Sequence, residues 1–157
     1  MAIKEIVTHP SAYLRKKSAP VKKRYLGVQE CQDFIDDMID TMIKHDGIGL
    51  AAPQVAKNLN IIVALDGKNP LVFINPKLYR FSWGKVEVEE GCLSIPGVWG
   101  KVNRHRAVSV VALDRKGKRI RMRAKGMLAV ILQHEVDHIN GVLFIDKAKN
   151  IQEPLKM

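Results

Sequence analysis

The most informative segment of the chain is Gln133-His134-Glu135-Val136-Asp137-His138-Ile139-Asn140-Gly141. It follows an apolar run at positions 127–132 and ends at a glycine, which predicts a helix over about 126–140. Residues four positions apart share a helix face, so His134 and His138 can bind one metal ion, and Glu135 can take a proton from a metal-bound water. The alternative is two exposed histidines on a polar face. The apolar turns before the motif favour a buried helix that holds its ligands still.

Length and composition indicate one globular domain. The chain has 157 residues, of which 46% are apolar and 27% charged, enough for a hydrophobic core in a soluble protein. No apolar run approaches the ~20 residues that span a bilayer, and the N-terminus lacks a signal-peptide layout. The two cysteines, Cys31 and Cys92, do not suggest a disulfide framework. We therefore expect a cytoplasmic protein without membrane contact.

The formal net charge of +10 comes from several basic clusters. They lie at positions 15–17, 22–24, 104–106 and 115–125. Such a surface favours encounters with polyanions, or it simply keeps the protein in solution. The sequence contains no zinc-finger spacing, no interleaved aromatic platform and no phosphate-cradling glycine loop, so no nucleic-acid motif sharpens this prediction.

Two helices and many short strands are predicted along the chain. Apolar residues at helical spacing indicate a first helix that starts near position 28, ends near positions 46–47 and buries Cys31. Strands are expected at 60–65, 71–74, 77–82, 85–89, 98–103, 107–113, 118–123 and 142–145. In the strand at 118–123, arginines alternate with apolar residues, which predicts one face turned inward and a basic face turned outward. Glycine-bearing segments at 47–54 and 90–97 interrupt them, and the first should form neither a helix nor a regular central strand. The fold class is α+β, with mostly antiparallel sheets packed around a central metal-binding helix that carries H-E-x-x-H.

The helix supplies only two ligands, whereas a catalytic metal usually has three from the protein. The pattern H-E-x-x-H-x-x-G-x-x-H would provide the third, but its last position is Phe144. Only Asp146 and Glu153 follow as acids, so the third ligand is expected upstream.

Cys92 is the strongest upstream candidate, because it lies in a segment bounded by glycine and proline that can present a thiolate to a cleft. From the residue alone, Cys92 could also be a small buried side chain. His9, His45 and His105 compete with it, but their settings favour surface positions: next to a proline, at a charged helix end and between two arginines.

Three segments together resemble the signature motifs of the peptide deformylases of bacterial type. These segments are 47–54 (GIGLAAPQ), 90–94 (EGCLS) and 133–138 (QHEVDH). The flanking sequences at 74–76 and 141–146 agree with the resemblance. The family removes the N-formyl group from N-formylmethionine at the start of newly synthesised polypeptides and releases formate. The resemblance implies a single catalytic domain over residues 1–157 that acts on formylated nascent polypeptides in the bacterial cytoplasm.

The resemblance also implies a role for individual residues. The metal ligands would be Cys92, His134 and His138. Glu135 would be the general acid/base as a metal-bound hydroxide attacks the formyl carbon, and Gln54 with the backbone N–H of Leu93 would stabilise the oxyanion. The residues implied to bind substrate are Ile48, Gly49, Gly91, Met127, Val130 and Ile131. The implied cofactor is one divalent ion, Fe²⁺ in the cell, with Zn²⁺, Ni²⁺ or Co²⁺ possible in a purified sample.

Some expectations concern support and docking. Glu90 is expected to pair with Arg104 behind the cysteine segment, and Asp137 to be exposed. Many bacterial members have a longer C-terminal helix that can dock on the ribosome, whereas Pro154 argues against one here. The basic clusters could still make transient ribosome contact, and we expect a monomer.

Two other functions compete with this reading. A metal-dependent peptidase would share H-E-x-x-H but lacks its usual third ligand here. A basic RNA-associated protein with a structural metal would usually have four protein ligands, and the sequence offers three.

Overall fold

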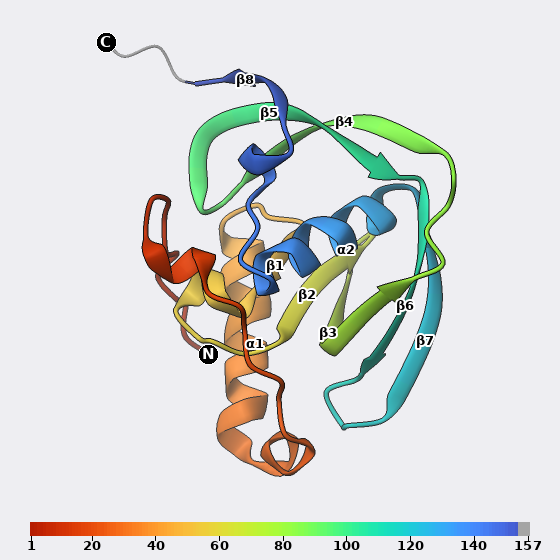
Figure 1. The fold of residues 1–157 in the computed structure, drawn as a ribbon. Coiled ribbons are helices and arrows are strands. Elements are labelled where there is room, and N and C mark those ends of the chain that lie inside the picture. Colours follow the sequence, from red (N-terminus) through yellow and green to blue (C-terminus); the bar gives the residue numbers. More distant parts are fainter. Residues whose placement is uncertain (154–157) are drawn as a thin grey trace.

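A computed structural model describes residues 1–153 and consists there of two α-helices and two β-sheets (Figure 1). Helix α1 spans Gln29–Lys44, and helix α2 spans Gly126–Ile139. Helix α2 lies between the sheets and packs on strands of both. All strand pairs are antiparallel, so the predicted α+β fold around the motif helix is confirmed.

The larger sheet has five strands in the order β1-β2-β3-β6-β7. These strands are β1 Gly49–Ala51, β2 Ile61–Asp66, β3 Asn69–Tyr79, β6 Ala107–Leu113 and β7 Arg119–Lys125. The strands predicted at 71–74 and 77–82 are one continuous strand, because β3 absorbs its proline in a register shift between Ile74 and Lys77. The segment at 47–54 was predicted to form neither a helix nor a regular central strand. It contains β1, a short edge strand, followed by a one-turn 3₁₀ helix, η3, over Ala52–Val55.

The smaller sheet has the order β4-β5-β8. It contains β4 Lys85–Cys92, β5 Ile95–His105 and β8 Lys149–Gln152. The segment at 90–97 was expected to interrupt the strands, but it forms the turn of the β4–β5 hairpin, in which Cys92 pairs with Ile95. The hairpin therefore holds Cys92 on a paired strand end.

The prediction of a strand at 142–145 is wrong. Residues Phe144–Asp146 form a 3₁₀ helix, η4, and the following polar tail supplies strand β8 instead. The carboxylate of Asp146 accepts a hydrogen bond from the Leu143 N–H at 3.0 Å, which closes a turn that local apolar character does not reveal. The prediction about Pro154 and the C-terminal helix lies outside the described residues.

The hydrophobic core lies on both sides of the larger sheet. Helix α1 buries Ile35, Met38 and Met42 completely, and Cys31 with them as predicted. Leu132 of α2 is also fully buried, in a second cluster with strands of the sheet. This packing fixes α2 between the layers, which a helix with functional side chains requires.

Strand β7 has the alternation that the sequence predicts. Arg119, Arg121 and Arg123 are exposed on its outer face, whereas Ala124 is buried. Within residues 1–153, neither α1 nor α2 has the length and apolar character of a membrane-spanning helix.

Candidate active site

Three metal-ligand side chains converge between α2 and the β4–β5 hairpin. The ligand atoms of Cys92, His134 and His138 all lie within 4.8 Å of one another. The Nε2 atom of His138 is 3.2 Å from the Cys92 Sγ and 3.2 Å from the His134 Nε2. A tetrahedral site with ordinary zinc–ligand bond lengths would separate two nitrogens by about 3.3 Å, and a nitrogen from a sulfur by about 3.6 Å. The three donors therefore fit one metal ion.

None of the competing histidines joins this group of ligand atoms. His105 instead lies 2.7 Å from the backbone oxygen of Ser82 through its Nδ1 atom. His9 is exposed, and the exposed His45 lies along the pocket wall. Tertiary structure thus selects Cys92 among the candidates left open by the sequence.

A buried ion-pair network supports His134. Its Nδ1 atom lies 2.7 Å from the Glu90 carboxylate, which also accepts hydrogen bonds from Arg104 at 2.7 and 3.0 Å. The predicted Glu90–Arg104 pair is therefore confirmed. The prediction of an exposed Asp137 is wrong: its side chain is 17% exposed and accepts a 2.7 Å hydrogen bond from Arg104, because this face of α2 turns toward β5.

The network fixes the charge around the ligands. Burial alone would raise the pKa of Glu90, but hydrogen bonds from His134 and Arg104 outweigh burial and lower it to about 2. Burial likewise opposes a charged His134 ring, but hydrogen bonds with Cys92 and Glu90 raise its pKa. Because a histidine ligand must be deprotonated at its donor atom, a cation bound at His134 Nε2 would take the place of that proton. Burial lowers the pKa of His138, which leaves that ring neutral, as metal binding requires.

Glu135 lies beside the ligands in a desolvated position. It is 4% exposed, and its Oε2 atom has no hydrogen-bond partner among the residues described. Burial raises the pKa of Glu135 to about 7, so this carboxyl group can both accept and donate a proton near neutral pH. The absence of a side chain at Gly49 leaves room for it: a Cβ there would overlap the Glu135 carboxylate and lie 2.8 Å from Ile131 Cγ2.

Gln54 points its amide toward the same centre. It belongs to the 3₁₀ helix η3, Ala52–Val55, and its Oε1 atom accepts a 2.9 Å hydrogen bond from the Ala51 N–H. Its Nε2 atom therefore faces Cys92 Sγ at 3.5 Å and the Ser94 hydroxyl at 3.1 Å. Ser94 is fully buried and was not singled out from the sequence, although it ends the second motif.

These residues line one pocket of about 550 Å³. The predicted site residues in its wall are Ile48, Gly49, Gln54, Gly91, Cys92, Leu93, Met127, Val130, Ile131, His134 and Glu135. His138 is 1% exposed and lies behind this wall. Met127 and Ile48 are about half exposed and can contact a ligand directly.

Two aromatic residues near the site were given no functional role by the sequence analysis. Trp99 of β5 is half exposed in the pocket wall, and a Cβ at Gly91 would lie 2.9 Å from its ring. Phe144, at the position where a histidine would complete the longer zinc motif, stacks on His134 with ring centroids 6.2 Å apart. The aromatic character of Phe144 was visible in the sequence, but its contact with His134 was not.

Comparison with known proteins identifies the family. The family model described as polypeptide deformylase matches residues 3–154. The peptide deformylase of Syntrophomonas wolfei is 44% identical over 148 residues, which cover 94% of this chain and 95% of that protein.

Two solved structures extend this likeness to three dimensions. A Synechococcus elongatus peptide deformylase in complex with actinonin has a TM-score of 0.88 and 41% identity, covering 94% of this chain and 79% of that one. A Met-Ala-Ser-bound class I type b peptide deformylase from Acinetobacter baumannii has a TM-score of 0.89 and 32% identity, covering 93% and 98%. The chain described here belongs to the polypeptide deformylase family of metal-dependent hydrolases.

Proposed function

We propose that this protein removes the N-formyl group from N-formylmethionine at the start of newly synthesised polypeptides and releases formate. The observation that carries the proposal is the convergence of Cys92, His134 and His138 with Glu135 and Gln54 on one pocket. The family match and the Met-Ala-Ser peptide bound by the Acinetobacter relative support it.

Cys92, His134 and His138 would hold one divalent metal ion, which we propose is Fe²⁺ in the cell and can be Zn²⁺, Ni²⁺ or Co²⁺ in a purified sample. Such an ion supplies Lewis acidity, which lowers the pKa of a water molecule and polarises a carbonyl oxygen. Glu90 orients the His134 ring through its Nδ1 atom and keeps Nε2 available as the donor.

Glu135 acts as the general acid/base in this proposal. Its buried carboxylate accepts a proton from the attacking water and then delivers a proton to the leaving amine of methionine. The pKa of about 7 lets the same group perform both transfers at neutral pH.

Gln54 and the backbone N–H of Leu93 donate hydrogen bonds to the oxyanion that forms as the formyl carbon becomes tetrahedral. The hydrogen bond from Ala51 holds the Gln54 amide in place before the substrate arrives. Fixed donors of this kind are each worth about 3–4 kcal/mol of barrier.

The substrate peptide would lie between the edges of the two sheets. Gly49 is on β1 and Gly91 on β4, and each is an edge strand with unpaired backbone groups. An extended peptide can add to such an edge through main-chain hydrogen bonds. The methionine side chain would then lie in the apolar part of the pocket, whose residues are Ile48, Met127, Val130 and Ile131.

The test compares formyl-Met-Ala-Ser with unformylated Met-Ala-Ser, using protein purified without oxygen because a thiolate ligand is prone to oxidation. We expect formate release from the formylated peptide only. Glu135→Gln should slow it by about 10²- to 10⁴-fold, while Glu30→Gln, the same change at an exposed position of α1, should not.

Cleavage of peptide bonds in the unformylated substrate would contradict the proposal and indicate a peptidase. A fully metallated protein that releases no formate would indicate a structural metal. Cys92→Ser should weaken or exchange the metal, and unchanged metal content would exclude Cys92 as a ligand.

We further propose that residues 1–157 act as one catalytic domain and that the protein works as a monomer in the cytoplasm, where formylated chains emerge during translation. Sedimentation of the metallated protein tests the monomer. The expected transient ribosome contact through the basic clusters stays a prediction.

A further inference from the structure

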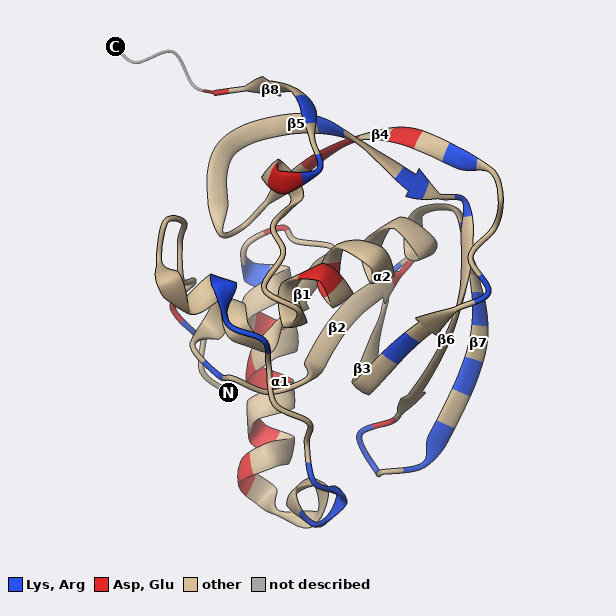
Figure 2. Ribbon diagram, viewed as in Figure 1, with Lys and Arg blue, Asp and Glu red and all other residues tan. Residues whose placement is uncertain are grey.

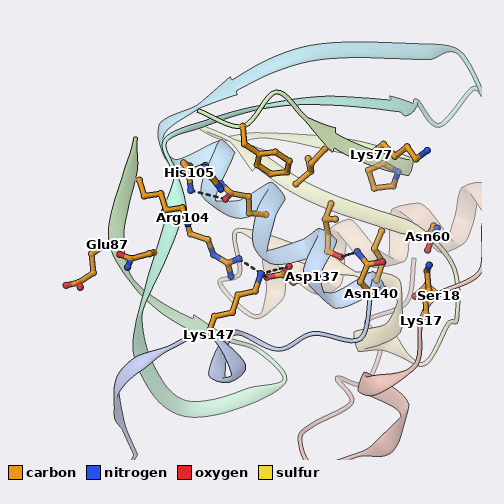
Figure 3. Close-up of a pocket in the computed structure, with 18 of the residues that line it drawn as sticks. Lys17, Ser18, Asn60, Lys77, Glu87, Arg104, His105, Asp137, Asn140 and Lys147 are labelled. Atoms are coloured by element: carbon orange, nitrogen blue, oxygen red, sulfur yellow. Dashed lines mark hydrogen bonds and ion pairs between the residues drawn. The ribbon is translucent and has the colours of Figure 1, made fainter. Parts of the chain in front are cut away.

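A second, larger pocket lies on the other side of α2 from the candidate active site. Its volume is about 1110 Å³, and Gln133, Val136 and Asn140 of α2 contribute to its wall. The active-site pocket is lined instead by α2 residues such as Val130 and His134. Figure 3 shows Asp137 and Asn140 reaching toward this second pocket, with Ser18 and Lys77 at one end and Arg104 at the other. We call it the basic pocket.

The basic pocket carries an excess of positive charge. Seven Lys or Arg residues line it against two acidic ones, Glu87 and Asp137. These acids are already paired, Glu87 with Lys101 and Asp137 with Arg104 and Lys147. The remaining cations have no acidic partner within residues 1–153 and are Lys17, Lys77, Lys85 and Lys149. The pocket is therefore complementary to a polyanion.

One end of the basic pocket contains buried polar atoms without partners. Ser18 is 4% exposed, and neither its hydroxyl nor the buried Asn60 Oδ1 atom has a hydrogen-bond partner among the described residues. Both residues line the pocket near Lys17 (Figure 3). Buried polar groups are normally hydrogen-bonded. The Ser18 hydroxyl can donate to an oxygen atom of a ligand, whereas Asn60 Oδ1 only accepts and would need an N–H or O–H group of the ligand.

Exposed aromatic rings adjoin the other end. Phe81 is 46% exposed and lines both the basic pocket and a neighbouring one that contains Trp83 and Arg123. The Trp83 side chain is completely exposed, and the Phe81 ring packs on His105 with centroids 5.0 Å apart. The sequence showed no interleaved aromatic platform, but the loop between β3 and β4 places Phe81 and Trp83 in the wall of one pocket with Arg123 of β7. We call these two rings the Phe81–Trp83 platform.

The surrounding charge extends this surface. Figure 2 shows Lys and Arg along β7, at the ends of β3 and β5 and in the loop between β3 and β4, whereas the acidic residues of α1 lie elsewhere on the molecule. An asymmetric field of this kind orients a polyanion toward the basic pocket during encounter.

We propose that the basic pocket and the Phe81–Trp83 platform together bind single-stranded nucleic acid. The unpaired lysines contact phosphates, and unstacked bases stack on the two exposed rings, the combination that single-strand binding surfaces use. An acidic peptide would use the lysines but has no reason to use an exposed indole, and a duplex keeps its bases stacked. Because α2 separates the two pockets, the oligonucleotide and the formylated peptide can bind at the same time.

The experiment measures fluorescence anisotropy of labelled 12-nucleotide oligouridine and oligothymidine with the metallated full chain between 50 and 200 mM KCl. The basic-pocket variant Lys77→Gln/Lys85→Gln/Lys149→Gln should bind at least tenfold more weakly at 50 mM KCl. The slope of log affinity against log salt should fall by about 2, because each phosphate contact on a single strand contributes about 0.7. Trp83→Ala should bind about tenfold more weakly, the size of one lost base stack.

The matched control is Lys22→Gln/Lys23→Gln/Arg24→Gln, which removes the same charge from exposed residues that line neither pocket of this surface. It should change affinity less than twofold. Formate release from formyl-Met-Ala-Ser should be unchanged in all these variants. A failure of the nucleic-acid proposal can therefore be distinguished from a failure of the proposed deformylase activity.

Equal losses in the two triple variants would overturn the proposal, since binding would then follow net charge alone. Absence of oligonucleotide binding at 50 mM KCl would overturn it, as would unchanged affinity in Trp83→Ala. Tighter binding of an oligoglutamate peptide than of either oligonucleotide would assign the surface to acidic proteins instead.

Discussion

Arg104→Met tests the buried network behind the proposed metal ligands. The Arg104 side chain is 3% exposed and donates hydrogen bonds of 2.7 and 3.0 Å to Glu90 and 2.7 Å to Asp137. Methionine keeps much of its volume but removes all three. Glu90, 6% exposed, would retain only His134 as a charged partner. Breaking a buried ion pair in this way costs about 3–5 kcal/mol in the free energy of unfolding.

The matched control is Lys101→Met, three residues earlier on the same strand. Lys101 lies 3.5 Å from Glu87, and both side chains are about half exposed, 49% and 54%. Exposed pairs of this kind contribute about 1 kcal/mol or less. Replacing a cation of β5 by methionine is thus expected to lower the free energy of unfolding much more at position 104 than at position 101.

The assay is urea unfolding followed by circular dichroism, with excess chelator present so that metal loading does not contribute to the difference. Arg104→Met should lower the unfolding free energy by about 3–5 kcal/mol, and the added change Glu90→Gln should restore part of it by removing the unpaired charge. If Arg104→Met stays within about 1 kcal/mol of Lys101→Met, the range expected for exposed pairs, the network does not stabilise the fold and our reasoning is refuted.

Three further predictions concern the active site and acid stability. Gly49→Ala should lower formate release by about 100-fold with metal content retained, because its Cβ would displace the Glu135 carboxylate and misplace the general acid/base. Gln54→Ala should lower kcat by about 10²- to 10³-fold with little effect on metal content, as expected for a lost oxyanion donor. The hydrogen bond from Lys4 lowers the pKa of Asp37, so the stability that this carboxylate contributes is present above its unfolded pKa of about 3.9 and is lost as pH falls through the folded pKa. Asp37→Asn should therefore reduce the pH dependence of unfolding below about pH 4.

Each of these predictions has an outcome that would contradict it, and Gly49→Ala also has a matched control. Gly27→Ala introduces a Cβ with no atom within 4 Å and should leave formate release unchanged; equal effects at both glycines would point to general destabilisation. Wild-type kcat in Gln54→Ala would remove this side chain from the mechanism. An acid unfolding curve of Asp37→Asn that overlays the wild type would show that other carboxylates dominate.

Local patterns predict local structure in this chain. Helical spacing indicated α1 with Cys31 inside and α2 with both histidines on one face, because a helix repeats every 3.6 residues. Alternation predicted the basic outer face of β7 for the corresponding reason. The predictions were wrong where a short apolar run did not determine the type or the length of the secondary-structure element. Examples are β3, which is one bulged strand and not two, and the 3₁₀ helix η4, which was predicted as a strand.

The sequence alone indicated two of the proposed metal ligands, the neighbouring glutamate and three motifs, since these depend on residue type and spacing. Tertiary structure alone brought Cys92 to His138 across 46 positions and Gln54 to Ser94 across 40, and it buried Asp137 against Arg104. It also exposed Phe81 in the wall of the basic pocket and Trp83 in the pocket next to it. Contacts of this range depend on how the β4–β5 hairpin and the larger sheet pack around α2, and no local periodicity encodes that packing.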